Sequence, residues 1–468
     1  MAYQTIPLSV VGPTSQNKSQ QANSALTKNW YPEITIDGRS NAALLPWPGT
    51  VAFGTAPSEL DRGLHVFRNV LYHVNGDALY SVSSSGVYTK IGDIAGFSRC
   101  IFDDNGVEMA ITADGNAYSF NGVVLIKGDA AEFANTESVT MLNNTFLYNA
   151  ELDNFFVSEA GDALNFRAAG SAESKGDDLL RPYAFSQWVY MLGETTNEPW
   201  WNAAADTLGF DRIDGGIMEK GLGGLYTVAN TDQFMYFLGD DANVYQVIQS
   251  SIKLISTPEI SFQLGKLNIG SAVGWTMVLD GQDFFILNFD DDDLSYAYSE
   301  QTDSWFNLSS GVDNGRYIGS SYARVYNKHI SVDFSTGNTI EITDQAFDDI
   351  GQTLQRQRTL PPINSSKLGM GAGKRLLMSK AKFMLQTGQG LASGQGSDPA
   401  IEIEFSIDGG ATWEVIDWPK VGKLGQYLIN VEAWNMVSFY DIQFRLTMSD
   451  PVFSSLHDGS IDLKLAGY

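Results

Sequence analysis

The chain has 468 residues, of which 43% are hydrophobic and 18% are charged, and its formal net charge is −26. A chain of this length can hold two or three domains with a large core, and its negative charge argues against tight electrostatic binding of nucleic acid. The single cysteine, Cys100, excludes an intrachain disulfide, and no apolar run approaches the roughly 20 residues that a membrane-spanning helix needs.

The negative charge is concentrated in the middle of the chain. Residues 1–32 contain two lysines and no acid (+2), residues 33–350 contain 16 Lys and Arg against 44 Asp and Glu (−28), and residues 351–468 contain 11 of each. An acidic surface keeps a protein soluble, and it also repels DNA. The composition leaves both interpretations open.

Residues 1–57 are predicted to form an N-terminal arm, whose role in a platform is what the resemblance described below implies. The first part is rich in Ser, Gln and Asn, and arms of this kind often become ordered only against a partner. In the stretch that follows, Pro32, Pro46 and Pro48 exclude a helix, while Trp30 and Trp47 supply large side chains that can anchor the segment.

Residues 58–350 carry a repeated pattern of short strands. Leu64–Ile94 and Cys100–Ile126 each show strands of about five residues with alternating apolar and polar side chains, separated by Asn-Gly or Asp-Gly turns. Further copies, at a period of roughly 40–45 residues, begin near Val139, Leu180, Leu222, Ala272 and Arg316. This pattern predicts an all-β fold with a β-propeller of six or seven blades.

After the repeats, residues 351–375 are predicted to be a basic linker and residues 376–468 a β-sandwich-like domain. The stretch 351–397 has no acid, and Pro361-Pro362 and the glycine-rich run 368–375 favour a linker. Its basic side chains form either a solvated loop or a surface that contacts an acidic partner or phosphate. The candidate partner-facing residues are Arg356, Arg358, Lys367, Lys374, Arg375, Lys380 and Lys382.

One turn motif in the C-terminal domain fits the Asp-box pattern S-x-D-x-G-x-T-W. In this pattern the Asp carboxylate accepts hydrogen bonds from turn amides, and glycine supplies a positive φ. The motif predicts a structural hairpin formed by Ser406, Asp408, Gly410, Thr412 and Trp413. Sialidases carry several such motifs inside their propeller, whereas this copy lies outside the repeats, so it indicates a turn and not an enzyme.

No other motif points to chemistry. The run Asp290, Asp291, Asp292 and Asp293 lacks the glycine and the distal Glu of a calcium-binding loop, so we interpret it as an acidic hairpin tip or as acidic channel residues. The four histidines have no metal-ligand spacing, and neither a phosphate-binding glycine loop nor a nucleophile elbow is present. We therefore predict a non-enzymatic protein without catalytic, cofactor-binding or metal-binding residues.

The order of several short segments resembles that of the packaged-DNA stabilisation proteins, also called tail nozzle or tail hub proteins, of short-tailed bacteriophages. The similarity runs along most of the chain, from the arm to the C-terminal hairpin. The segments that carry it are Asn29–Glu33, Leu45–Pro46, Pro48–Gly49, Arg62–Gly63, Leu71–Tyr80, Gly92–Asp93, Glu219–Leu222 and Asp408–Gly409.

The resemblance implies a structural virion protein of the tail, made in the host cytoplasm, with a propeller and a platform built from the N-terminal arm and the C-terminal β-sandwich-like domain. It implies a homo-hexameric ring below the portal and its adaptor ring, which extends and helps close the DNA channel, stabilises packaged DNA and allows its ejection. Expected partners are the adaptor ring, a tail needle or plug, and tail fibres or spikes. Genomic DNA would pass without tight binding, and no membrane span is expected.

Two other functions fit the sequence. The first is a glycan-binding propeller, related to sialidases or acting as a receptor-binding tail component, to which the Asp-box lends weight. The second is a cellular propeller scaffold, which binding to host peptides would support. Association with portal–adaptor rings, retention of glycans on an array, and binding of host peptides distinguish the three.

Overall fold

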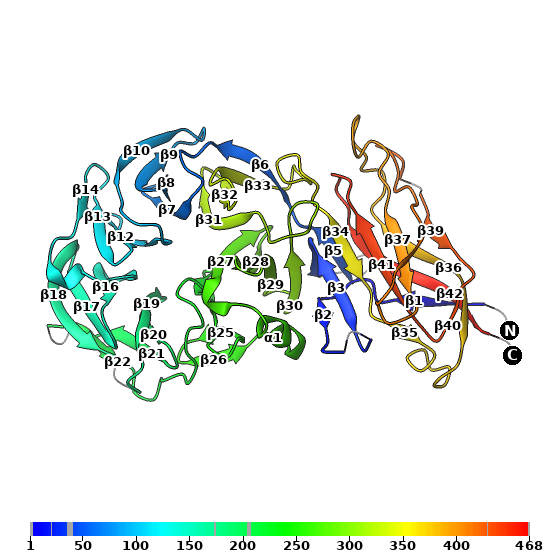
Figure 1. The fold of residues 1–468 in the computed structure, drawn as a ribbon, viewed down its shortest axis with the longest axis horizontal. Helices are drawn as coiled ribbons and strands as arrows, with labels where there is room; N and C mark the ends of the chain where they lie inside the picture. The colour runs from blue at the N-terminus through cyan, green and yellow to red at the C-terminus, as the bar shows by residue number, and fades with distance from the viewer. Residues whose placement is uncertain are drawn as a thin grey trace.

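The structure is a computed structural model that describes residues 3–19, 21–34, 41–172, 175–203, 207–427 and 429–466. Strands dominate these residues and form two parts, a ring of four-stranded sheets and a platform beside it (Figure 1). Helical structure among the described residues is limited to α1 (Pro258–Leu264) and the 3-10 turns η1 (Ala131–Phe133) and η2 (Ile269–Ser271). None of these is long and apolar enough to cross a membrane.

The first five blades of the ring follow one another along the chain, each running from an inner to an outer strand. Three of them consist of β7 (Asp61–Phe67), β8 (Val70–Asn75), β9 (Ala78–Val82) and β10 (Tyr88–Asp93); β11 (Ile101–Asp104), β12 (Met109–Ala113), β13 (Asn116–Phe120) and β14 (Leu125–Lys127); and β15 (Val139–Leu142), β16 (Thr145–Asn149), β17 (Asn154–Glu159) and β18 (Asp162–Ser171). The next two consist of β19 (Leu179–Phe185), β20 (Trp188–Gly193), β21 (Asn197–Asn202) and β22 (Phe210–Arg212); and β23 (Ala229–Asn230), β24 (Met235–Leu238), β25 (Val244–Ile248) and β26 (Ser251–Leu254).

The ring is closed by a strand from the beginning of the chain. The last blade consists of β31 (Gly319–Val325), β32 (Lys328–Asp333), β33 (Thr339–Thr343) and, as its outermost strand, β6 (Gly49–Gly54), which pairs antiparallel with β33. The predicted arm, which extended to residue 57, is therefore too long. Its end belongs to the propeller, because β6, which precedes the first blade, pairs with the last blade and joins the two ends of the repeat array.

One further blade-like unit is continuous with the platform. β27 (Ala272–Leu279), β28 (Gln282–Phe289), β29 (Leu294–Ser299) and β30 (Ser304–Leu308) begin an 11-stranded sheet. The sheet continues through β3 (Ser24–Lys28), β34 (Arg356–Thr359), β41 (Asp441–Met448), β37 (Glu402–Ser406) and β38 (Glu414–Asp417), with β2 (Ser15–Gln16) beside β3 and β35 (Ile363–Asn364) beside β41. With the six free-standing sheets, this unit makes a ring of seven, and a hydrophobic cluster lies between each neighbouring pair.

The platform is a two-sheet sandwich that combines both ends of the chain. Its second sheet consists of β39 (Val431–Trp434), β36 (Leu376–Leu385), β42 (Leu456–Leu465), β5 (Ala42–Pro46) and β4 (Trp30–Ile34), with β1 (Gln4–Leu8) paired to β42 and β40 (Ser438–Phe439) to β36. Side chains of both sheets share one core. The predicted linker 351–375 contains β34 and β35 and is thus partly built into the sandwich, because β34 fills the gap between β3 and β41.

The short strands form because apolar residues recur along them and tight turns separate them. Asp114–Gly115 (φ 45° and 71°) and Asp280–Gly281 (φ 51° and 81°) adopt left-handed backbone at hairpin turns, as two-residue hairpins with these residue types require. Alternation predicted strands buried on one face, but β12 and β16 are buried at every position. Both faces of these middle strands are shielded from solvent because a neighbouring blade packs on each side.

Candidate functional site: the propeller channel

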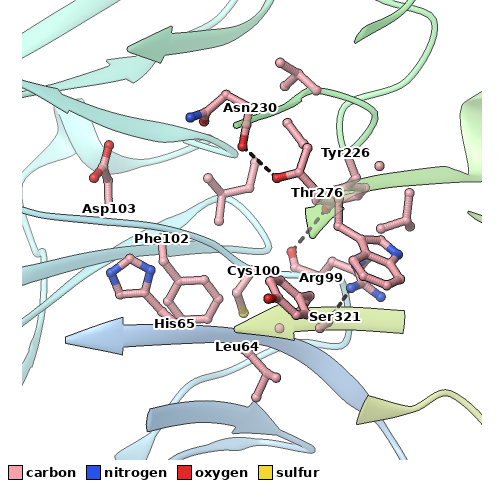
Figure 2. Close-up of a pocket in the computed structure, with 18 of the residues that line it drawn as sticks. Leu64, His65, Arg99, Cys100, Phe102, Asp103, Tyr226, Asn230, Thr276 and Ser321 are labelled. Carbon is pink, nitrogen blue, oxygen red and sulfur yellow. Dashed lines mark hydrogen bonds between the residues drawn. The ribbon is translucent and has the colours of Figure 1, made fainter. Parts of the chain in front are cut away.

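The innermost strands of the ring surround a channel along the propeller axis. β7, β11, β15, β19, β23, β27 and β31 and the residues next to them line a cavity of about 560 Å³. Figure 2 shows aromatic, hydroxyl and charged side chains gathered around this space, including Phe102, Asp103, Arg99 and Thr276. Every blade thus contributes side chains to the wall of the channel.

Asp61 connects the first blade to the last beside this channel. Its Oδ1 lies 3.1 Å from His73 Nε2, and its Oδ2 lies 3.6 Å from Arg99 Nη1. Ser320 and Ser321 donate hydrogen bonds to Oδ2 at 2.6 and 2.8 Å. Burial opposes the charge, but the hydrogen bond from His73 and the charge of Arg99 hold the pKa of Asp61 well below its ordinary value. The ionised carboxylate therefore neutralises Arg99.

Arg181, in β19, is a second arginine in the channel wall. Its Nη1 donates a hydrogen bond to the Leu225 carbonyl oxygen at 3.0 Å, and its guanidinium lies 5.1 Å from the centre of the Tyr183 ring. Its Nε is buried without a hydrogen-bond partner. Burial lowers the pKa of Arg181, because the surroundings solvate the charge less well than water does.

The end of β11 contributes two carboxylates. Asp103 Oδ2 accepts hydrogen bonds from Met141 N at 2.7 Å and Thr140 Oγ1 at 3.1 Å, which link the second blade to the third. Burial raises the pKa of Asp103. Asp104 Oδ2 lies 2.8 Å from His65 Nε2, and although burial acts in the opposite direction, this hydrogen bond lowers the pKa of Asp104.

The arrangement supports binding more readily than group-transfer chemistry. The Cys100 thiol lines the channel, but burial raises its pKa to about 12, so it stays protonated and is a weak nucleophile. Within the described ranges, no group of three or more His, Cys, Asp or Glu side chains is placed to hold a metal ion. Hydrogen-bond donors and aromatic rings remain as the groups that a ligand can meet.

The Asp-box residues form a compact turn outside the propeller. Asp408 Oδ1 accepts hydrogen bonds from Ser406 Oγ at 2.7 Å and Thr412 N at 2.9 Å, and Trp413 Nε1 donates to the Gly410 carbonyl oxygen at 3.2 Å. The hydrogen bonds from Thr412 lower the pKa of Asp408 to about 2. The geometry is that of a structural hairpin tip between β37 and β38.

Two of the predicted partner-facing basic residues are not available to a partner. Arg356 and Arg358 are buried in β34, which corrects that prediction. Arg358 donates hydrogen bonds to the Val10 carbonyl oxygen at 2.7 Å, the Pro13 carbonyl oxygen at 3.1 Å and Thr27 Oγ1 at 2.7 Å. The buried guanidinium donates the hydrogen bonds that water would otherwise give to the carbonyl oxygens of the N-terminal segment.

The other five basic residues fall into two groups. Lys380 and Lys382 lie in β36, where their Nζ atoms are 3.7 and 3.8 Å from Glu432 Oε1, so their charges are partly neutralised. The loop between β35 and β36 exposes the other three: Lys367, Lys374 and Arg375. Of the predicted basic residues, those in this loop remain candidates for a contact with a partner.

The acidic run lies in the hairpin between β28 and β29. Asp290 forms an ion pair with Arg316, and Asp293 Oδ1 accepts a hydrogen bond from Arg316 N at 2.8 Å. Asp291 and Asp292 accept hydrogen bonds from Asn268 at 2.6 and 2.7 Å. These four residues are all described, and none of them lines the propeller channel; they brace the hairpin tip.

Sequence reasoning did not single out Asp61, Arg99 or Arg181. These residues lie far apart in the sequence and meet only because every blade starts with an inner strand. The repeat starts predicted near Leu180 and Arg316 were the available signal, since they mark β19 and the approach to β31. A charged residue just after a repeat start is a candidate for the channel wall.

The fold and the channel define a β-propeller with a platform built into its sheet. Over residues 4–346 the chain matches the family described as Bacteriophage P22 Gp10, beta-propeller, and it belongs to this family. It is therefore a bacteriophage structural protein associated with the virion. The expected β-propeller is confirmed, and a search among curated proteins found no match.

Several solved structures are similar to the chain. The Pan2 WD40 domain of Neurospora crassa has 8% identity and a TM-score of 0.42, over 67% of this chain and 98% of that one. The computationally designed Ika8 protein has 11% identity and a TM-score of 0.40, over 71% and 100%. BamB from Moraxella catarrhalis has 10% identity and a TM-score of 0.36, over 64% and 98%.

Proposed function

We propose that this protein is a tail nozzle, or tail hub, protein that forms a homo-hexameric ring below the portal and adaptor rings of a short-tailed phage. In this role it extends and helps close the DNA channel, stabilises packaged DNA and allows its ejection, without enzymatic chemistry. A needle or plug and tail fibres or spikes are its further partners. Membership of the phage structural family supports the proposal.

The observation that carries the proposal is the unequal charge of the two parts. Residues 33–350 include all the strands of the free-standing blades and carry a net charge of −28. Residues 1–32 and 351–468 carry net charges of +2 and zero. A conduit for DNA needs walls that repel phosphate, and a docking face is easier to assemble when it is close to neutral. The propeller carries the negative charge in its overall composition, and the segments that form most of the platform are close to neutral.

The test is native mass spectrometry of the full chain mixed with purified cognate portal–adaptor rings. We expect six copies per ring. A variant with Lys374→Glu and Arg375→Glu should bind more weakly, because both side chains lie in the exposed loop of the platform. Lys127→Glu, an exposed lysine on the outer strand β14 of the propeller, is the matched control and should assemble normally. A folded, soluble wild type that does not associate would overturn the proposal.

A second candidate function, glycan binding, is favoured by two adjacent hollows on the propeller of about 320 and 390 Å³. Gln187 and Trp188 line both, Trp201 and Asn202 line one, and Gln233 lines the other. Indole rings offer flat apolar faces and amides offer both donors and acceptors, as a sugar ring requires. Retention of glycans on an array by the wild type, with loss in Trp188→Ala and none in the exposed platform control Trp418→Ala, would support this function.

A further inference from the structure

The charges in the channel wall do not cancel. Arg99 faces the Asp61 carboxylate at 3.6 Å, but neither Arg181 nor Arg324 forms an ion pair with any carboxylate that the structure describes. Both arginines line the same cavity. The channel wall therefore carries an enclosed arginine, Arg181, and an exposed one, Arg324, in a chain whose net charge is −26.

Arg181 is the more enclosed of the two. A guanidinium has five N–H donors, and the only hydrogen bond of Arg181 to the described residues is the one from Nη1 to the Leu225 carbonyl oxygen. A buried charge is costly unless a counter-charge or hydrogen bonds compensate it. The remaining N–H groups of this side chain thus have no hydrogen-bond partner among the described residues, and the side chain lies at the wall of a cavity.

The neighbouring groups supply only part of the counter-charge. Asp103 is the acid that shares the cavity wall, and its charge attracts Arg181. It forms no ion pair with Arg181 among the described residues, and its carboxylate accepts hydrogen bonds from Met141 N and Thr140 Oγ1 instead. The Tyr226 hydroxyl donates to the Arg99 carbonyl oxygen at 3.1 Å. Tyr226 and the aromatic walls therefore add donors and apolar surface, but no anion.

We propose that the propeller channel binds one small oxyanion, a carboxylate or a phosphate, with Arg181 as its principal ligand and Arg324 as a second cation. A cavity of about 560 Å³ is within the range of small-molecule sites and admits an organic acid of the size of citrate. An anion there completes the hydrogen bonds of Arg181, and charge-assisted hydrogen bonds of this kind are the strong ones. The inference does not depend on the proposed tail role.

The test is isothermal titration calorimetry of the full chain with inorganic phosphate and, separately, with citrate, at an ionic strength held constant with NaCl. We expect one anion per chain. Arg181→Gln should weaken binding at least about tenfold, because it removes a charge-assisted contact, and Arg324→Gln should weaken it less. Arg375→Gln, an exposed arginine on the platform, is the matched control and should bind like the wild type.

The two probes separate the sources of the ligand. Binding of phosphate alone identifies a phosphate site, and binding of citrate alone identifies a carboxylate site; either result supports the proposal if it depends on Arg181. Circular dichroism checks folding, and if Arg181→Gln does not fold, Arg181→Lys keeps the charge, loses the planar fork, and should bind several-fold more weakly. The proposal is overturned if the wild type binds neither probe, or if the folded Arg181 variants bind as tightly as the wild type.

Discussion

Several charged side chains of this acidic chain lie inside it. Arg62 is completely buried and donates hydrogen bonds to the carbonyl oxygens of Ser98, Gly76 and Ile94 at 2.7, 3.1 and 2.9 Å. Arg358 fastens the N-terminal segment in the same way. The planar guanidinium suits this role because its donors can satisfy several backbone carbonyls at once. At these positions arginine is structural, although sequence alone suggested a basic surface for Arg358.

Asp349, at the junction of propeller and platform, provides a prediction on pH dependence. Thr50 Oγ1 donates to its Oδ1 at 3.2 Å, while Oδ2 has no partner. Burial raises the pKa of Asp349 to about 6. Because this value exceeds the value of about 3.9 expected in the unfolded chain, the folded state binds the proton more tightly. Stability from this group therefore rises as the pH falls through 6 and levels off below about 4.

We expect the wild type to gain about 1–2 kcal/mol of unfolding free energy relative to Asp349→Asn between about pH 7.5 and pH 5. Urea denaturation at the two pH values measures this difference. Asp344→Asn, at an exposed position nearby, is the control and should follow the wild type. An identical pH dependence in Asp349→Asn and the wild type would show that this carboxyl titrates normally.

At the scale of elements, the closing strand β6 is the feature on which the ring depends. Gly86, in the loop between β9 and β10, has φ +77°, and a Cβ there would lie 2.0 Å from the Phe53 carbonyl oxygen of β6. Gly106 has nearly the same backbone, φ +79°, with no atom within 4 Å of its Cβ position. Both substitutions to alanine strain the backbone, but only the one at Gly86 also meets β6. A comparison of the two therefore separates the cost of backbone strain from the cost of the close approach.

Gly86→Ala should therefore destabilise the protein by at least about 2 kcal/mol more than Gly106→Ala, since both carry the strain but only one displaces backbone. Urea denaturation gives the difference. Hydrogen exchange should rise in β6 and β33 of Gly86→Ala and stay unchanged there in Gly106→Ala. Equal costs in the two variants would mean that β6 tolerates the displacement.

At the scale of the whole molecule, the propeller and platform share one sheet. Asn29 lies at the join, fully buried and with φ 55°. Its Nδ2 donates to the carbonyl oxygens of Ser309 at 3.0 Å and Gln355 at 2.7 Å, and its Oδ1 accepts from Ser309 N at 2.9 Å. One side chain thus connects the end of β30 to the strand that enters the platform. This continuity predicts that the two parts unfold together.

Differential scanning calorimetry should show one transition for the wild type and two for Asn29→Ala, which leaves buried polar groups unsatisfied at a cost of about 2–3 kcal/mol. Asn69→Ala is the control, because Asn69 has a similar φ of 62° but an exposed side chain. It should keep a single transition. Two transitions in the wild type would mean that the shared sheet does not couple the parts.

The repeat period, the turn residues and the Asp-box were enough to predict the blades and the hairpin of Ser406–Trp413, whereas a platform of mixed N- and C-terminal origin was expected only from the family resemblance. These features follow from residues that are close in sequence. The roles of Arg356 and Arg358 were misread because charge in a linear stretch does not reveal burial; both lie in a strand that completes a sheet. The end of the arm was misplaced because the partner of β6 lies almost 300 residues away.

By itself, the sequence determined the all-β class, the blade pattern and the separation of charge between propeller and platform, because alternation, turn chemistry and composition are local properties. Only the tertiary structure decided which strand closes the ring, which blade continues into the platform, and which side chains face the channel. Those outcomes depend on pairing between distant strands. Ser320 and Ser321 of the last blade reach Asp61 of the first only because the ring closes. The contacts of Arg99 and Arg181 are set by the packing of neighbouring blades.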